Sequence, residues 1–116
     1  MTDMHEMSLC ENLVEIVVKS AQNESVNQVE RIYLEIGQLS CVEVDAMHFC
    51  FDVISKGTVA EGAQLIIEQV PGQAKCHQCK TQFAVSSHYA ICPSCEHHKF
   101  TVISGDQMQI KNMEVI

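Results

Sequence analysis

Two Cys-x-x-Cys pairs, separated by twelve residues, constrain the fold more than any other feature of the sequence. They are Cys76-His-Gln-Cys79 and Cys92-Pro-Ser-Cys95. One such turn presents two thiolates to a single ion, and two turns complete the tetrahedral shell that zinc prefers. The spacing predicts a zinc site made by Cys76, Cys79, Cys92 and Cys95. We expect its role to be structural, because a closed shell of four thiolates leaves no open position for catalysis.

Other interpretations of the four cysteines are two unrelated thiol pairs or disulfides, and an iron site with the same sulfurs. An iron-loaded protein would absorb visible light, whereas a zinc-loaded one would not. His77, His97 and His98 flank the pairs. Exchange of a cysteine for one of these histidines at altered pH is an alternative, but solvent-exposed histidines are the better interpretation.

The segment between the pairs has too few apolar residues for a core of its own. Phe83, Val85, Tyr89 and Ile91 are enough only for a small ribbon. Metal binding should therefore supply most of the stability of this module, and removal of the metal should unfold it locally.

The chain has seven cysteines, an odd number, and its first ten residues lack the basic start and apolar run of a signal peptide. We therefore expect a reducing compartment, the cytoplasm, and no membrane association. Cys10, Cys41 and Cys50 fall on predicted helices, where buried small hydrophobes explain them better than metal ligation does.

The formal net charge of −8 disfavours nucleic acid as a partner, because such binding depends on phosphate neutralisation. The charge is uneven: residues 1–73 hold 12 acidic and three basic residues, whereas residues 74–100 hold three lysines and one acid. This difference indicates two modules. No catalytic triad, phosphate-binding glycine loop or paired catalytic carboxylates can be placed, so we do not expect an enzyme.

Two amphipathic helices are predicted, each preceded by a capping-box pattern. Ser8 and Glu11 would cap a helix that ends near residue 23, and Ser40 and Glu43 would cap a helix that ends before Gly57. The apolar faces are formed by Leu9, Leu13, Ile16, Val17 and Ser20 in the first helix and by Val44, Met47, Phe51 and Ile54 in the second.

Three strands are predicted at residues 29–36, 65–70 and 108–115, with turns at Pro71-Gly72 and Gly105-Asp106. The fold class is α+β: a small three-stranded mixed sheet with two helices on one face and an inserted zinc-ribbon or knuckle module. The predicted domains are an α/β core of residues 1–73 and 101–116 and a zinc-binding module of residues 74–100.

Several motifs together resemble one known family. They are Met4-His-Glu-Met-Ser-Leu9, Ile36-Gly-Gln-Leu-Ser40, Val70-Pro-Gly72, the paired cysteine turns and Gly105-Asp106. In this combination, which runs along essentially the whole chain, the sequence resembles the HypA/HybF family of nickel metallochaperones. These proteins help to insert nickel into [NiFe] hydrogenases.

The resemblance implies a nickel site at the amino terminus, carried by His5 with Glu6 beside it. Met4 would contribute through its amine if it were the first residue, as in the family, but here three residues precede it. If Met4 is not the first residue, its nitrogen is an amide, and nickel coordination would shift to the amides of His5 and Glu6, or to a carboxylate such as Asp3 or Glu43.

The resemblance also implies partners: the GTPase that acts in nickel delivery and the hydrogenase large subunit. Because members of the family pair into dimers, it allows a homodimer of this chain as well. Zinc would be structural, and nickel would be the cargo. The alternatives from other functional classes are a zinc-ribbon adaptor without nickel transfer and a four-cysteine iron electron carrier.

Overall fold

The computed structural model describes residues 4–116, and it divides the chain into two compact units. Unit 1 combines the chain up to Leu34 with Val42–Ile67 and Ile110–Ile116. Unit 2 combines Glu35–Cys41 with Glu68–Gln109, and the predicted zinc module of residues 74–100 lies wholly inside it.

Two helices form one layer of unit 1. Helix α1 spans Met4–Asn23, helix α2 spans Val44–Ile54, and the two pack against each other. Their buried side chains recur three and four residues apart, as an amphipathic helix requires. In α1 these residues are Glu6, Cys10, Leu13, Val14, Val17 and Ala21, and in α2 they are Met47, Cys50 and Phe51.

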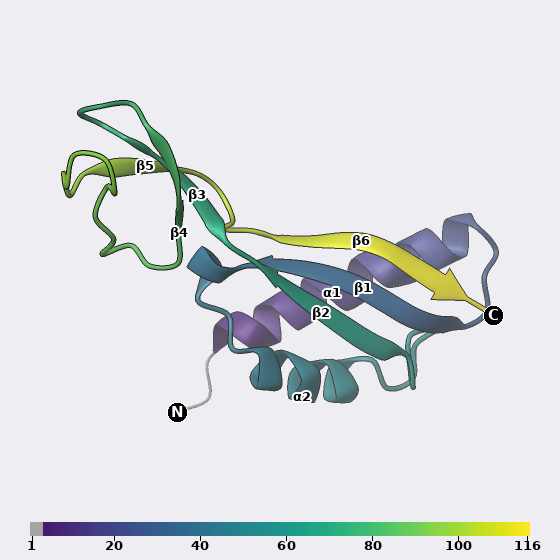
Figure 1. The fold of residues 1–116 in the computed structure, drawn as a ribbon. Coiled ribbons are helices and arrows are strands. Elements are labelled where there is room, and N and C mark those ends of the chain that lie inside the picture. The colour runs from purple at the N-terminus through teal and green to yellow at the C-terminus, as the bar shows by residue number, and fades with distance from the viewer. Residues whose placement is uncertain (1–3) are drawn as a thin grey trace. The chain divides into compact units, whose positions relative to one another are not determined.

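The helices cover one face of a sheet whose strand order is β2-β1-β6 (Figure 1). These strands span Val29–Gly37 (β1), Gln64–Val70 (β2) and Met108–Val115 (β6). Strands β1 and β2 run in the same direction, whereas β6 runs opposite to them. The Gly37 amide donates to the Gln107 carbonyl and the Leu39 amide to that of Gly105, as expected for antiparallel chains. The predicted fold class, with two helices over a mixed sheet, is confirmed.

Strand β1 buries alternate side chains, as its sequence predicts. Ile32, Leu34 and Ile36 are fully buried, while Arg31 and Tyr33 are half-buried on the other face. This period of two matches the pleat of a strand with one covered face.

Both predicted capping boxes are wrong. Helix α1 begins at Met4, so Ser8 lies inside it, exposed to solvent. The N-cap of α2 is Glu43 and not Ser40, whose hydroxyl donates to the Gly37 carbonyl oxygen at 2.6 Å. The predicted apolar face of α1 is also wrong at Ile16, which is 53% exposed.

Unit 2 contains a second three-stranded sheet, with order β4-β3-β5. Strand β3 (Gly72–Cys76) pairs antiparallel with β4 (Gln82–Val85) and with β5 (Phe100–Ser104). The predicted turn at Pro71-Gly72 is wrong, because Pro71 alone separates β2 from β3. The bend at Gly105-Asp106 is confirmed, and Gly105 has a φ of +87°.

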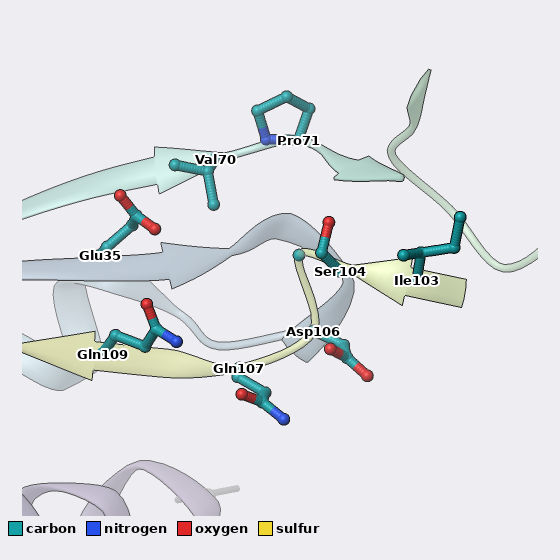
Figure 2. A pocket seen from close by; sticks show the side chains of 9 residues that line it. Glu35, Val70, Pro71, Ile103, Ser104, Asp106, Gln107 and Gln109 are labelled. Carbon is teal, nitrogen blue, oxygen red and sulfur yellow. The ribbon is translucent and has the colours of Figure 1, made fainter. Parts of the chain in front are cut away.

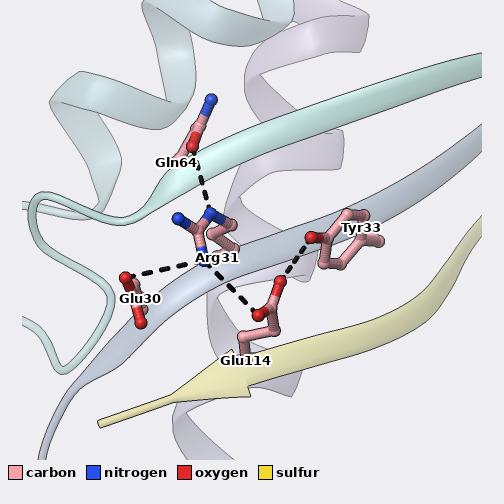
Figure 3. A network of polar contacts seen from close by, with 5 residues as sticks. All are labelled: Glu30, Arg31, Tyr33, Gln64 and Glu114. Carbon is pink, nitrogen blue, oxygen red and sulfur yellow. Dashed lines mark hydrogen bonds and ion pairs between the residues drawn. The ribbon is translucent and has the colours of Figure 1, made fainter.

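A polar network joins the three strands of unit 1 (Figure 3). Arg31 contacts Gln64 on β2, Glu114 on β6 and its neighbour Glu30, with distances of 3.4, 3.4 and 3.5 Å. The Tyr33 hydroxyl donates to the other oxygen of Glu114. This hydrogen bond raises the pKa of Tyr33, because the phenol loses a carboxylate acceptor when it ionises.

Three glycines in unit 2 allow backbone segments to pass closer than any side chain would permit. A Cβ atom on Gly37 would collide with the carbonyl group of Gly105, and one on Gly105 would collide with the backbone of Gly72. A Cβ atom on Gly72 would collide with the side chain of Leu39. The close approach therefore depends on glycine at all three positions.

We expect Gly37→Ala to destabilise the protein by about 1–3 kcal/mol, because the added methyl group meets rigid backbone atoms. Denaturant unfolding of the zinc-loaded protein measures this loss. Gln38→Ala, at an exposed neighbouring position, serves as the control and should change stability by less than about 0.5 kcal/mol. Equal stability of the two variants would show that a methyl group at position 37 fits beside the Gly105 carbonyl group, contrary to this account.

Candidate metal centre

The four predicted zinc ligands meet in unit 2. The Sγ atoms of Cys76, Cys79, Cys92 and Cys95 all lie within 4.8 Å of one another. The pairs Cys76–Cys95 and Cys79–Cys92 are 3.5 and 3.6 Å apart. Four sulfurs about 2.3 Å from a central zinc ion would be separated by roughly 3.8 Å, so the cluster has the size of a zinc site.

Two turns of the same kind hold these sulfurs. The Lys80 amide donates to the Cys76 carbonyl at 3.2 Å, and the Glu96 amide donates to the Cys92 carbonyl at 2.9 Å. The residue after each second cysteine is left-handed, with φ of +64° at Lys80 and +63° at Glu96. The equal spacing in the sequence thus produces two equivalent turns that face each other.

The first cysteine of each pair is anchored in the apolar core of unit 2. Cys76 and Cys92 are buried in a cluster with Phe83 and Val85, and the Phe83 and Phe100 rings meet edge to face at 5.6 Å. Cys79 is exposed, and Cys95 is partly so. The cluster is therefore fixed from one side and open to solvent on the other.

The surroundings shift the pKa values of Cys76, Cys79 and Cys95 in different directions. The Thr81 hydroxyl and amide lower the pKa of Cys79 to about 6, and the Cys79 amide lowers the pKa of Cys76. The His97 amide acts on Cys95 in the same direction. Burial and the three neighbouring thiols outweigh it and raise the pKa of Cys95 to about 12. The raised pKa of Cys95 means that a metal ion competes with at least one proton for the cluster at neutral pH.

Among the side chains that the structure describes, no histidine belongs to the cluster. His77 and His98 are exposed, and His77 Nε2 lies 2.7 Å from Thr101 Oγ1. His97 contributes its backbone, since its carbonyl accepts from the Cys92 amide at 3.0 Å. The described side chains contain no other group of three or more histidine, cysteine or acidic residues that could hold a metal.

The three cysteines outside the cluster differ in burial. Cys10 and Cys50 are buried between the helices, as predicted, and burial raises the pKa of Cys10 to about 12. The prediction for Cys41 is wrong: it is exposed and follows the short 3-10 helix η1 (Gln38–Ser40) with a φ of +58°. Leu39 is the buried residue of that helix.

The predicted nickel residues lie in the first turn of α1. The side chains of Met4 and His5 fall outside the described part of the structure. The Glu6 side chain is only 1% exposed, and its Oε1 accepts a hydrogen bond from the Glu43 amide at 3.0 Å. Its Oε2 is buried without a protein partner among the described residues.

Glu6 anchors the start of α1, a role that the capping and nickel-site predictions did not include. Residues 6, 10, 13 and 17 share one helical face, so its position among buried residues could have been read from the spacing. Its hydrogen-bond partner could not, because Glu43 lies 37 positions away. Through this bond the start of α1 is tied to the start of α2.

A cavity of about 330 Å³ lies at the other end of the β3–β5 ladder from the cysteines (Figure 2). Glu35, Ser104, Asp106 and Gln109 are among the residues that line it. In the ladder Cys76 pairs with Phe100, whereas Gln73 pairs with Ser104 at the rim of the cavity. The polar cavity is thus separate from the sulfur cluster.

We expect zinc binding near pH 7 to release at least one proton per ion, because burial and the neighbouring thiols raise the pKa of Cys95 to about 12. Zinc affinity should accordingly fall as the pH is lowered. Calorimetry in buffers of different ionisation enthalpy measures the proton count. Binding without proton release would contradict this assignment.

We expect Cys92→Ser to weaken zinc binding by at least about tenfold, whereas Cys41→Ser, at a cysteine outside the cluster, should not weaken it.

Comparisons with known proteins agree with this geometry. A sequence model of the HypA family, described as hydrogenase/urease nickel incorporation metallochaperones, matches residues 4–115. The chain is similar to the hydrogenase maturation factor HypA of Alkalilimnicola ehrlichii, with 45% identity over 97% of this chain and 99% of that protein. It is also similar to that of Nostoc sp., with 46% identity over 97% and 96% of the two chains.

A solved structure shares the fold. The solution structure of the Ni metallochaperone HypA from Helicobacter pylori superimposes with a TM-score of 0.72 over 96% of this chain and 97% of that one, at 20% identity. Together with the full-length family match and the close sequence relatives, this shows that the chain belongs to the HypA family of nickel-incorporating metallochaperones.

Proposed function

We infer that this protein binds Ni(II) at the start of helix α1 and passes it on for the maturation of [NiFe] hydrogenase. The family match over residues 4–115 is the observation that carries the inference, since the family is described by nickel incorporation. The four-cysteine cluster would hold a structural zinc ion, and nickel would be the transported cargo. The protein would perform no catalysis of its own.

We assign the nickel ligands to His5 and Glu6, with the Met4 nitrogen as a further donor if Met4 is the first residue. Nickel(II) favours nitrogen and oxygen donors in a planar arrangement, which an imidazole and nearby backbone nitrogens can supply. The buried Oε2 of Glu6 supports a ligand role for this carboxylate, since it has no protein partner within the described part of the chain.

Glu6 would have two functions, one for each carboxylate oxygen. Its Oε1 bonds to the Glu43 amide and thereby fixes the first turn of α1, where His5 lies. Its Oε2, which is buried and has no protein partner among the described residues, would bind the ion. A ligand that is already held in place loses little entropy on binding, which favours affinity without a dedicated cage.

Delivery requires partners. We assign them to the nickel-delivery GTPase and the large subunit of [NiFe] hydrogenase, and a homodimer is a further assembly to test.

We place the protein in the cytoplasm. Within residues 4–116, no helix is both long enough and apolar enough to cross a membrane. No specific observation favours the two alternative functions, a zinc-ribbon adaptor without nickel transfer and a four-cysteine iron electron carrier.

Nickel titration of the zinc-loaded protein by calorimetry tests the site. We expect His5→Ala to weaken binding by at least about tenfold, because it removes a ligand. His48→Ala, an exposed histidine of α2, is the matched control and should bind as the unchanged protein does. A chain that begins at Met4 measures the contribution of a free amine.

Glu6→Gln separates the two functions of this residue. Glutamine can still accept the hydrogen bond from Glu43 but places a neutral group where Oε2 lies. We expect a similar thermal midpoint and weaker nickel binding. Equal nickel affinity in Glu6→Gln would remove Glu6 from the ligand set, and equal affinity in His5→Ala would move the site elsewhere.

A further inference from the structure

Helix α2 carries an apolar strip on its solvent-facing side. The Phe49 side chain is 68% exposed and that of Val53 is 46% exposed, although phenylalanine is among the residue types most often buried. The two residues are four positions apart, so their side chains are neighbours along one face of the helix. The opposite face of α2 is in the core through Met47, Cys50 and Phe51.

Acidic residues flank this strip. Asp45 precedes Phe49 by four positions and Asp52 follows it by three, and both are exposed. Helix α2 contains no lysine or arginine. Its exposed side includes two large apolar side chains and two carboxylates, which we call the Phe49 face (Asp45, Phe49, Asp52 and Val53). The exposed His48 precedes Phe49, and the exposed Lys56 follows the end of the helix.

The charge of unit 1 reinforces this local pattern. The segments that form it hold 11 acidic residues and four lysines or arginines, so most of the net charge of the protein lies there. Such a field attracts cationic partners and raises their association rate.

We propose that the Phe49 face is a docking site for a cationic amphipathic helix of a partner protein. Apolar residues of that helix would pack against Phe49 and Val53, while its lysines or arginines would lie opposite Asp45 and Asp52. This arrangement of an apolar seam with flanking charges is how paired helices achieve both affinity and choice of partner.

A second copy of this chain fits the same face poorly. Two Phe49 faces brought together would place carboxylates against carboxylates, and like charges across an interface are unfavourable. The apolar strip is also small compared with the roughly 1,200–2,000 Å² that a stable interface buries. A weak, reversible contact with a basic partner suits the face better.

Fluorescence anisotropy with a labelled 18-residue leucine–lysine helical peptide tests the proposal on the zinc-loaded full chain, without nickel. A leucine–glutamate peptide of the same pattern is the control ligand. We expect binding of the first peptide only, with affinity that falls as salt is added. Because no nickel is present, failure here would not bear on the nickel site.

Two double variants test the two components of the face. Phe49→Ser with Val53→Ser keeps the charge and should weaken binding by at least about tenfold, as expected for loss of an aromatic anchor. Asp45→Asn with Asp52→Asn should weaken binding and reduce its salt dependence. Ile16→Ser changes an apolar position on α1 whose exposure of 53% lies between those of Phe49 and Val53, and this variant should bind like the unchanged protein.

Three results would overturn the proposal. They are absence of leucine–lysine peptide binding, equal binding by the Phe49/Val53 double variant, and self-association that is lost in that variant. The last would assign the face to a second copy. Circular dichroism of each variant confirms that the helices remain folded, as expected for substitutions at exposed positions.

Discussion

Unit 2 depends on four cysteine sulfurs brought within 4.8 Å of one another. Its sheet is short, and its core consists of a few residues around Phe83 and Val85. Ionisation of all four sulfurs together is unfavourable without a cation, because the resulting thiolates repel one another and burial disfavours their charges. A zinc ion would remove this conflict by neutralising the thiolates, so that metal binding and folding of the unit become one process.

In unit 1 a single buried carboxylate links the beginnings of two helices. Glu6 accepts the Glu43 amide hydrogen, which has no partner within its own helix. The bond places the first turn of α1 in a defined position on the core, and the other carboxylate oxygen has no protein partner among the residues that the structure describes. Under the proposed function, the two units would serve two kinds of metal chemistry: sulfur ligands for a permanent ion in unit 2, and nitrogen and oxygen ligands for a transported ion in unit 1.

Much of this arrangement could be predicted from local patterns. The alternation of Ile32, Leu34 and Ile36 identifies a strand, and the spacing of the cysteine pairs identifies the metal cluster, because both signals are complete within a few residues. The predictions failed where contacts between residues far apart in the sequence determine the local structure. Helix α1 begins before Ser8, with the Glu6 carboxylate bonded to a residue 37 positions away, and the Pro71-Gly72 pair continues into β3 instead of turning. Exposure of Ile16 and Cys41 depends on tertiary packing in the same way.

The central claim is that this protein keeps zinc and nickel at separate sites with different ligands. X-ray absorption at the zinc and nickel edges of the doubly loaded protein tests it most directly. The account predicts zinc surrounded by four sulfurs at about 2.3 Å, and nickel surrounded by nitrogen and oxygen with imidazole scattering that disappears in His5→Ala. Sulfur ligands on nickel, or nitrogen ligands on zinc, would contradict it.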